Sequence, residues 1–117
     1  MQALGRSLRK RFIEELMARF TALWPKQTSQ LGNGYRHFME STVERAMSYG
    51  IETESAAARF INLYFVWGPQ FETRPEHTWA LRILNDANLS GQAKIDDLAF
   101  RTKLRLQAMQ VNRRHTP

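Results

Sequence analysis

The amino-acid sequence predicts an all-α protein, a single-domain bundle of about five helices in which the third helix is central. Apolar residues recur every three to four positions in several long segments, as they do along amphipathic helices. Short stretches containing Gly, Pro, Asn or Ser separate these segments. No part of the sequence alternates polar and apolar residues as a half-buried strand does. Because 117 residues supply one modest core but not two, we expect residues 1–117 to form one domain.

The first two helices are predicted over residues 4–24 and 35–49. Apolar residues at helical spacing mark the first of them: Leu8, Phe12, Leu16, Phe20 and Leu23. Pro25 is expected to end this helix because proline lacks a backbone N–H, and residues 26–34 are expected to form a loop. Gly50 follows the second helix, where a left-handed C-terminal cap favours glycine.

The third helix is predicted over residues 54–67, with Thr53 as its N-cap. From residue 60 to 67 the sequence is apolar on nearly every side, and such a helix must be covered on every side. We therefore place it at the centre. A β-strand is the alternative for this aromatic-rich run, but the preceding alanines and the Gly68-Pro69 stop favour a helix.

Two further helices are predicted before the C-terminus. Thr73 and Glu76 match the Thr-x-x-Glu pattern of a capping box, which would start the fourth helix. Ser90 can cap the last helix, expected over about residues 92–112. Residues 113–117 are expected to be a frayed tail.

Charge is distributed unevenly along the chain, whose formal net charge is +6. Residues 1–12 carry four basic side chains and residues 98–117 carry five, without any acidic one. The part between them is acidic, with eight basic and eleven acidic side chains. Basic ends can attract nucleic acid, anionic lipid or an acidic protein surface, and a solvated helix face without a specific partner is the alternative.

The sequence does not predict a membrane-spanning helix, a signal peptide or a disulfide bond. The chain has no cysteine, which excludes disulfides and thiolate metal sites. No apolar run approaches the ~20 residues that span a bilayer, and the basic N-terminus lacks the apolar stretch of a signal peptide. We expect a cytoplasmic protein that does not insert into a membrane.

The sequence holds no recognisable catalytic, cofactor-binding or metal-binding motif. His37, His77 and His115 lie far apart and lack partners at the spacing of a zinc-binding helix, so we interpret them as surface or capping residues. Phosphate-binding glycine loops and nucleophile elbows are missing as well. We therefore expect a protein that is not an enzyme and needs no cofactor.

The last helix carries two apolar stripes. One consists of Ile95, Leu98, Thr102, Leu106 and Met109; the other consists of Phe100, Leu104, Ala108 and Val111. A terminal helix needs one stripe for its own core, so the second stripe, with Arg101 and Arg105 beside it, is a candidate partner-binding surface. The alternative is a helix clasped between two others, which would bury both stripes.

A second candidate contact is the turn between the third and fourth helices. Trp67 and Phe71 flank the rigid Gly68-Pro69 bend, and tryptophan is common at binding hot spots. The alternative is a hydrophobic plug that closes the bundle.

Part of the sequence resembles small helical proteins encoded among type VI secretion effector genes of Gram-negative bacteria. The residues that carry the resemblance are Tyr49-Gly50-Ile51, residues 60–68, Phe71, Trp79-Ala80 and residues 83–86. The likeness covers about a third of the chain. The resemblance implies a cytoplasmic co-chaperone. Its partner would be either the adaptor chaperone, which loads a toxin onto the secretion spike, or the toxin itself. The matching residues are structural, so no functional residue is carried over from the family.

The leading hypothesis is a non-enzymatic co-chaperone or adaptor that binds another protein through apolar helix faces bordered by arginines. An immunity protein or antitoxin that neutralises a toxin directly is the first alternative, and a homodimer is also compatible with the sequence. A small basic nucleic-acid-binding protein is the second alternative. It is disfavoured because apolar residues interleave with the charges of the last helix and because the third helix is too apolar for groove recognition.

Overall fold

The computed structural model describes the backbone of residues 6–115 and the side chains of residues 9–111. Within this part of the chain every regular element is helical, which confirms the all-α prediction and excludes a strand at residues 60–67. The α-helices are α1 (Arg6–Leu23), α2 (Pro25–Leu31), α3 (Tyr35–Ser48), α4 (Glu54–Trp67), α5 (Thr78–Leu84) and α6 (Gly91–His115). The 3₁₀ turns are η1 (Gly32–Gly34), η2 (Phe71–Thr73) and η3 (Pro75–His77).

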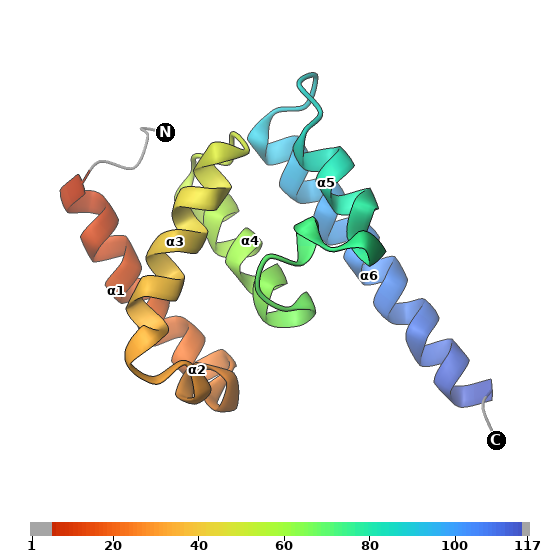
Figure 1. The fold of residues 1–117 in the computed structure, drawn as a ribbon, viewed down its shortest axis with the longest axis horizontal. Helices are drawn as coiled ribbons and strands as arrows, with labels where there is room; N and C mark the ends of the chain where they lie inside the picture. Colours follow the sequence, from red (N-terminus) through yellow and green to blue (C-terminus); the bar gives the residue numbers. More distant parts are fainter. Residues whose placement is uncertain (1–5, 116–117) are drawn as a thin grey trace.

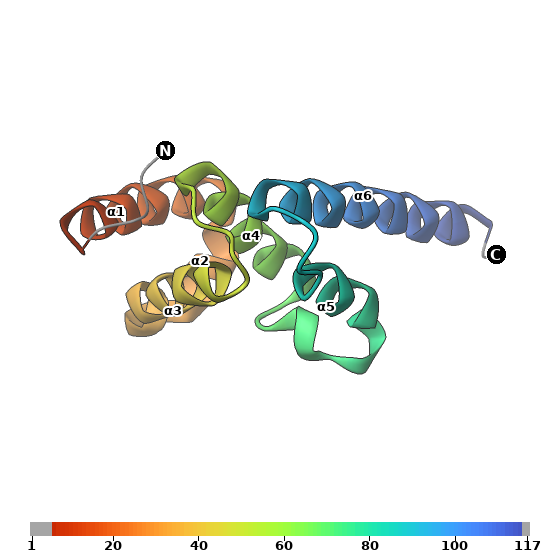
Figure 2. The same cartoon turned by 90° about the horizontal axis from the view of Figure 1, so that it is seen from above.

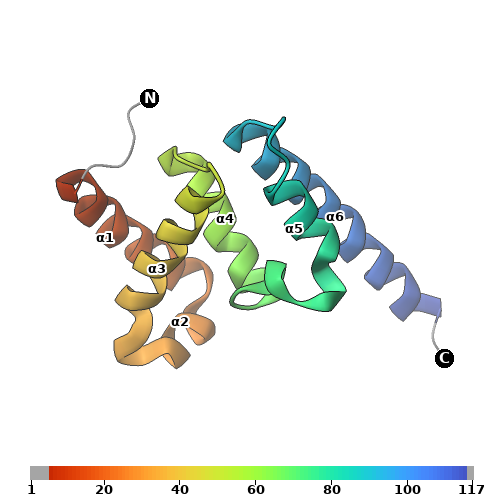
Figure 3. The ribbon, with the colours of Figure 1, turned by 45° about the horizontal axis from the view of Figure 1, so that its top comes forward.

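Helix α4 lies between an N-terminal layer of α1, α2 and α3 and a C-terminal pair of α5 and α6 (Figure 1). It contacts α3 on one side and α6 on the other, while α1 packs on α3 and α5 packs on α6. Figure 3 shows the same order from a tilted view. The prediction that this helix is central is therefore confirmed.

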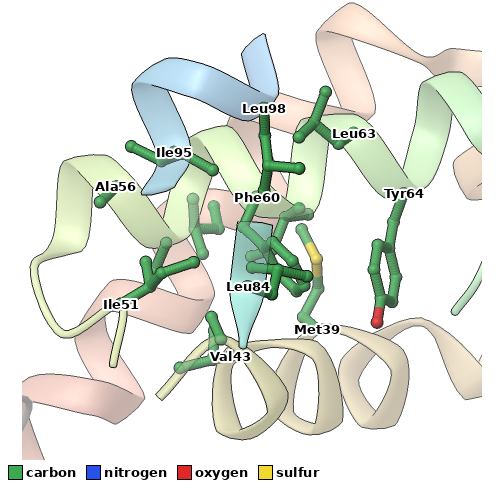
Figure 4. Close-up of a cluster of buried hydrophobic side chains, with 14 of the residues drawn as sticks. Met39, Val43, Ile51, Ala56, Phe60, Leu63, Tyr64, Leu84, Ile95 and Leu98 are labelled. Carbon is green, nitrogen blue, oxygen red and sulfur yellow. The ribbon is translucent and has the colours of Figure 1, made fainter. Parts of the chain in front are cut away.

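One continuous core joins these helices. Figure 4 shows Phe60 of α4 among Met39 and Val43 of α3, Leu84 of α5 and Leu98 of α6. All five side chains are almost completely buried. Residues from three other helices thus close around the apolar run that the sequence places at the centre.

The predicted helix caps form at three positions. Thr53 Oγ1 accepts a hydrogen bond from the Ala56 N–H at 3.2 Å, at the start of α4. Gly50 has a φ of +84°, which L-residues rarely adopt, after the end of α3. Ser90 Oγ accepts a bond from the Ala93 N–H at 3.1 Å and caps α6.

The predicted loop over residues 26–34 is wrong. Pro25 does end α1, but it also opens α2, because proline is favourable in the first turn of a helix, where its missing N–H has no partner. Thr28 of α2 is buried, and the helix ends at Leu31, with Gly32 as its C-cap at a φ of +53°.

The predicted capping box of Thr73 and Glu76 is also wrong. Pro75 follows Arg74 and disfavours the helical conformation there, so Arg74 is extended and separates η2 from η3. Thr73 Oγ1 instead donates to the Gln70 carbonyl oxygen at 2.8 Å. As a result the fourth long helix is reduced to the seven residues of α5.

Helix α6 is longer than predicted and extends beyond the other helices (Figures 1 and 2). Its backbone is helical through His115, three residues past the predicted end, where a frayed tail was expected. Residues 116–117 lie outside the described part of the chain. The protein therefore has an elongated outline, with extents of 52 × 37 × 22 Å.

Candidate partner-binding surface on the last helix

The N-terminus of α6 is docked against the turn between α3 and α4. A Cβ atom at Gly91 would lie 2.2 Å from the Gly50 carbonyl oxygen, so only glycine permits this approach. Lys94 is buried, and its Nζ donates to the Tyr49 carbonyl oxygen at 2.8 Å, just after the C-terminus of α3. A cation at a helix C-terminus is favourable because the last carbonyl groups are negative.

The next two turns of α6 belong to the core. Ile95, Leu98 and Thr102 are buried against α4. The Trp67 indole Nε1–H donates to Thr102 Oγ1 at 3.1 Å, and Arg59 of α4 pairs with Asp96 at 2.7 Å. These contacts hold the first half of α6 in a fixed direction.

The second half of α6 has no such cover. Every side chain from residue 103 to residue 111 is exposed. We name residues 100–111 the distal segment. Its predicted binding residues are open to solvent: Phe100 is 59% exposed, Leu104 49% and Val111 50%. The alternative in which the last helix is clasped between two others is therefore excluded.

The distal segment is apolar on a second face as well. Leu106 and Met109, which the sequence assigns to the core stripe, are 38% and 50% exposed. They continue the buried row of Leu98 and Thr102 but lie past the end of the packed body. At 100° per residue this inner face lies roughly opposite the outer stripe of Phe100, Leu104 and Val111. The distal segment thus exposes apolar side chains on two opposite sides.

Basic side chains border both faces. After Asp97 the chain has no acidic residue, so every charged side chain of the distal segment itself is positive. Arg101 pairs with Asp97 one turn earlier, at 2.9 Å. Arg105 stacks on Trp79 of α5, with its guanidinium carbon 4.4 Å from the ring centroid. Arginine suits such a position because its stem covers apolar surface while its planar head binds carboxylates.

A cleft of ≈ 280 Å³ separates the distal segment from η3 and α5. Its lining residues are Trp67, Glu76, His77, Trp79, Arg105, Ala108 and Met109. On the other side of α6, a groove of ≈ 370 Å³ separates it from α4, and Leu63, Val66, Leu106 and Gln110 contribute to its walls. The distal segment is therefore flanked by one hollow on each side.

Of the two aromatic residues predicted to contact a partner at the turn after α4, only Trp67 is accessible. Phe71 is completely buried, with its ring edge-to-face against Tyr64, so it belongs to the core and cannot touch a partner. The alternative of a hydrophobic plug describes it correctly. Trp67 is half-buried and reaches the cleft, although its N–H is bonded to Thr102.

The interpretation of His77 as a surface or capping residue is only partly correct: it occupies the N-cap position of α5 without a side-chain capping hydrogen bond, and it is buried. Its ring is buried 5.0 Å from the ring of Trp67 and 5.5 Å from that of Phe71. Its Nδ1 lies 3.1 Å from the Phe71 carbonyl oxygen. His37 is exposed, and the side chain of His115 lies outside the described residues. Among side chains 9–111, no three His, Asp or Glu residues gather where they could hold a metal ion.

Glu72 forms a buried cluster that no sequence pattern indicates. One carboxylate oxygen, Oε2, accepts hydrogen bonds from Arg45 Nε at 2.7 Å and from the hydroxyls of Tyr49 and Tyr64 at 3.0 Å. Burial, together with this carboxylate, raises the pKa of the Tyr64 hydroxyl. The cluster joins η2 to α3 and α4 and so positions the turn that leads to the cleft.

Comparison of the chain with protein-family models, with curated proteins and with solved structures gave no match. Within the described residues, no helix combines the length and the apolar character needed to cross a membrane.

Proposed function

We propose that this protein is a non-enzymatic co-chaperone or adaptor that binds another protein through the distal segment of α6. The observation that carries the proposal is the exposure of apolar side chains on two opposite sides of one helix. Apolar patches on soluble proteins are usually small, and larger ones commonly mark interaction sites.

The two-sided exposure favours a protein partner over a membrane or a nucleic acid. A helix on a bilayer surface buries one apolar face and leaves the other in water, where polar residues belong. A nucleic-acid groove offers phosphates and base edges, which complement the basic residues but not the outer stripe. A groove or helical bundle of a second protein covers both faces.

Apolar contact alone would not give a stable complex. Complete burial of a Leu, Met, Val or Phe side chain contributes about 1.5–3 kcal/mol. The five exposed apolar side chains of the distal segment are roughly half exposed, so their burial contributes on the order of 5 kcal/mol. A micromolar complex requires about 8 kcal/mol. The arginines beside the stripes are therefore expected to add paired carboxylates.

The resemblance to proteins of type VI secretion effector clusters supports the choice of partner. In such a cluster the partner would be the adaptor chaperone of a toxin, or the toxin, met in the cytoplasm before secretion. Gly50 and Phe60 of the matching segment serve the fold, whereas Trp79 lines the cleft beside α6. Trp67, which belongs to the same likeness, lines this cleft as well. The likeness therefore includes two residues next to the proposed surface.

The test compares the wild-type chain with a Phe100→Glu/Leu104→Glu double variant as bait in affinity purification from the native host. Leu23→Glu is the matched control, because Leu23 is 61% exposed but lies on α1. We expect the double variant to lose a partner that the wild type and the control retain, with unchanged helical circular dichroism. Equal recovery of the same partner by all three baits would refute the proposed surface.

A toxin-neutralising immunity protein is the second candidate. Residues 98–117 hold five basic side chains and no acidic one, which favours this function because a basic surface complements an acidic active-site cleft. Co-expression with the captured toxin separates the two functions. An immunity protein rescues growth, whereas a co-chaperone changes the level or secretion of the toxin without protecting the cell.

A further inference from the structure

We infer that the cleft between α5 and the distal segment is the anchor site for an acidic amphipathic helix of the partner. An apolar side chain of that helix enters between Trp79 and Met109, and a neighbouring carboxylate pairs with Arg105. The inference rests on the proposed function and adds the chemistry of the partner to it.

One wall of the cleft is preorganised. The Trp67 indole is held by Thr102, and the ring of His77 is held by the Phe71 carbonyl group. Trp79 packs edge-to-face on both rings, with centroid distances of 6.4 Å to Trp67 and 6.2 Å to His77. An aromatic wall that is rigid before binding loses little entropy when a partner arrives.

The size of the cleft suits side chains of a protein. At ≈ 280 Å³ it is smaller than the pockets of about 300–1,000 Å³ that enclose small-molecule ligands. Its opposite wall, Ala108 and Met109, is exposed and belongs to the helix that we propose as the binding element. Met adapts its shape readily to an incoming apolar group.

Arg105 supplies the polar part of the site. Its guanidinium stacks on Trp79, and it makes no ion pair with any carboxylate of the described residues, Glu76 in the same cleft included. A stacked guanidinium keeps its N–H groups at the edge of the plane, where they bind a carboxylate in two-point geometry. Arg101, by contrast, is already paired with Asp97.

Charge decides between an acidic partner and a second copy of the chain. Residues 98–117 hold five basic side chains and no acidic one. Two copies paired along these residues would place basic against basic, which is unfavourable. An acidic helix meets the opposite charge at Arg101, Lys103 and Arg105, and Glu76 is the one carboxylate that lines the cleft.

The test uses two synthetic helical peptides that share the same Leu positions, one with Glu and the other with Lys at the remaining charged positions. Each is titrated into the ¹⁵N-labelled full chain, and the three indole N–H signals are followed. The Trp24 indole is the internal reference, because it is bonded to Asn62 at 3.1 Å, away from the cleft. We expect the Glu peptide to shift the Trp67 and Trp79 signals, to leave that of Trp24 unchanged, and to bind at least about tenfold more tightly than the Lys peptide.

Variants of the full chain sharpen the result. Arg105→Gln should weaken the Glu peptide about tenfold, and Met109→Glu should abolish its binding. Arg82→Gln is the matched control, because Arg82 is an exposed arginine of α5 that does not line the cleft. Equal affinity for both peptides, or an undiminished affinity of Arg105→Gln, would overturn the inference.

Three other outcomes would also count against it: a shift of the Trp24 signal alone, tighter binding to anionic vesicles than to the Glu peptide, or dimerisation of the chain through α6. Failure of this inference is distinguishable from failure of the proposed function. If the natural partner is lost from Phe100→Glu/Leu104→Glu but retained by Arg105→Gln and Met109→Glu, the outer stripe binds it and the cleft does not. If neither set of variants affects the captured partner, the proposed function itself fails.

Discussion

Replacement of Glu72 by Ala should be among the most destabilising single changes in this protein. The carboxylate is inaccessible to solvent and accepts three hydrogen bonds, one of them from an arginine. A bond to a charged group contributes about 1.5–3 kcal/mol, and a buried polar group left without its partner costs about 1–3 kcal/mol. Arg45 and Tyr49 can turn towards water because both are partly exposed, but the hydroxyl of Tyr64 is buried. We therefore expect a loss of about 3–5 kcal/mol, as for other broken buried pairs.

Urea unfolding followed by circular dichroism measures this loss directly. Glu76→Ala is the control, because Glu76 is exposed four residues along the chain and should change the free energy of unfolding by less than about 0.5 kcal/mol. A Glu72→Ala variant within about 1 kcal/mol of wild type would show that the cluster does not hold η2 to α3 and α4, and the reasoning would be refuted.

Three further predictions concern Gly91, Tyr64 and the outer stripe of α6. Gly91→Ala should lower the free energy of unfolding by about 1–3 kcal/mol, because its Cβ would press on the Gly50 carbonyl oxygen; an unchanged melting temperature would contradict the close approach. Because the pKa of the Tyr64 hydroxyl is raised in the folded protein, the unfolded chain loses the hydroxyl proton at a lower pH than the folded chain does. The free energy of unfolding should therefore fall as the pH rises above about 10, and it should fall less in Tyr64→Phe. An equally steep fall in both proteins would contradict this prediction. Phe100→Glu and Leu104→Glu should each change stability by less than about 0.5 kcal/mol, since neither side chain is needed by the core; a large loss in chemical denaturation would show otherwise.

The helices that are long and periodic could be predicted from the sequence, because burial of one face imposes a 3.6-residue pattern. The central place of α4 could be predicted for a different reason, since its Phe60–Trp67 run is apolar on nearly every side and must be covered on every side. The segment from Gly68 to His77 could not be predicted, because its course depends on contacts with distant helices. Glu72, for example, is bonded to Arg45 of α3, to Tyr49 just after α3 and to Tyr64 of α4.

The candidate surface was predictable in kind but not in extent. A second apolar stripe on a terminal helix indicated that Phe100, Leu104 and Val111 would be exposed, and they are. Periodicity assigns a residue to a face of its helix but does not show where the packed body ends. For that reason Leu106 and Met109 were expected in the core although they lie beyond it.

Hydrogen–deuterium exchange on the free chain and on the complex purified from the host shows whether the distal segment binds the partner. In the free chain, amides of residues 103–111 should exchange faster than those of α4, because every side chain of that part of α6 is exposed. In the complex, the same amides should become protected. Protection confined to other helices, with residues 103–111 exchanging as in the free chain, would contradict the claim that this helix binds the partner.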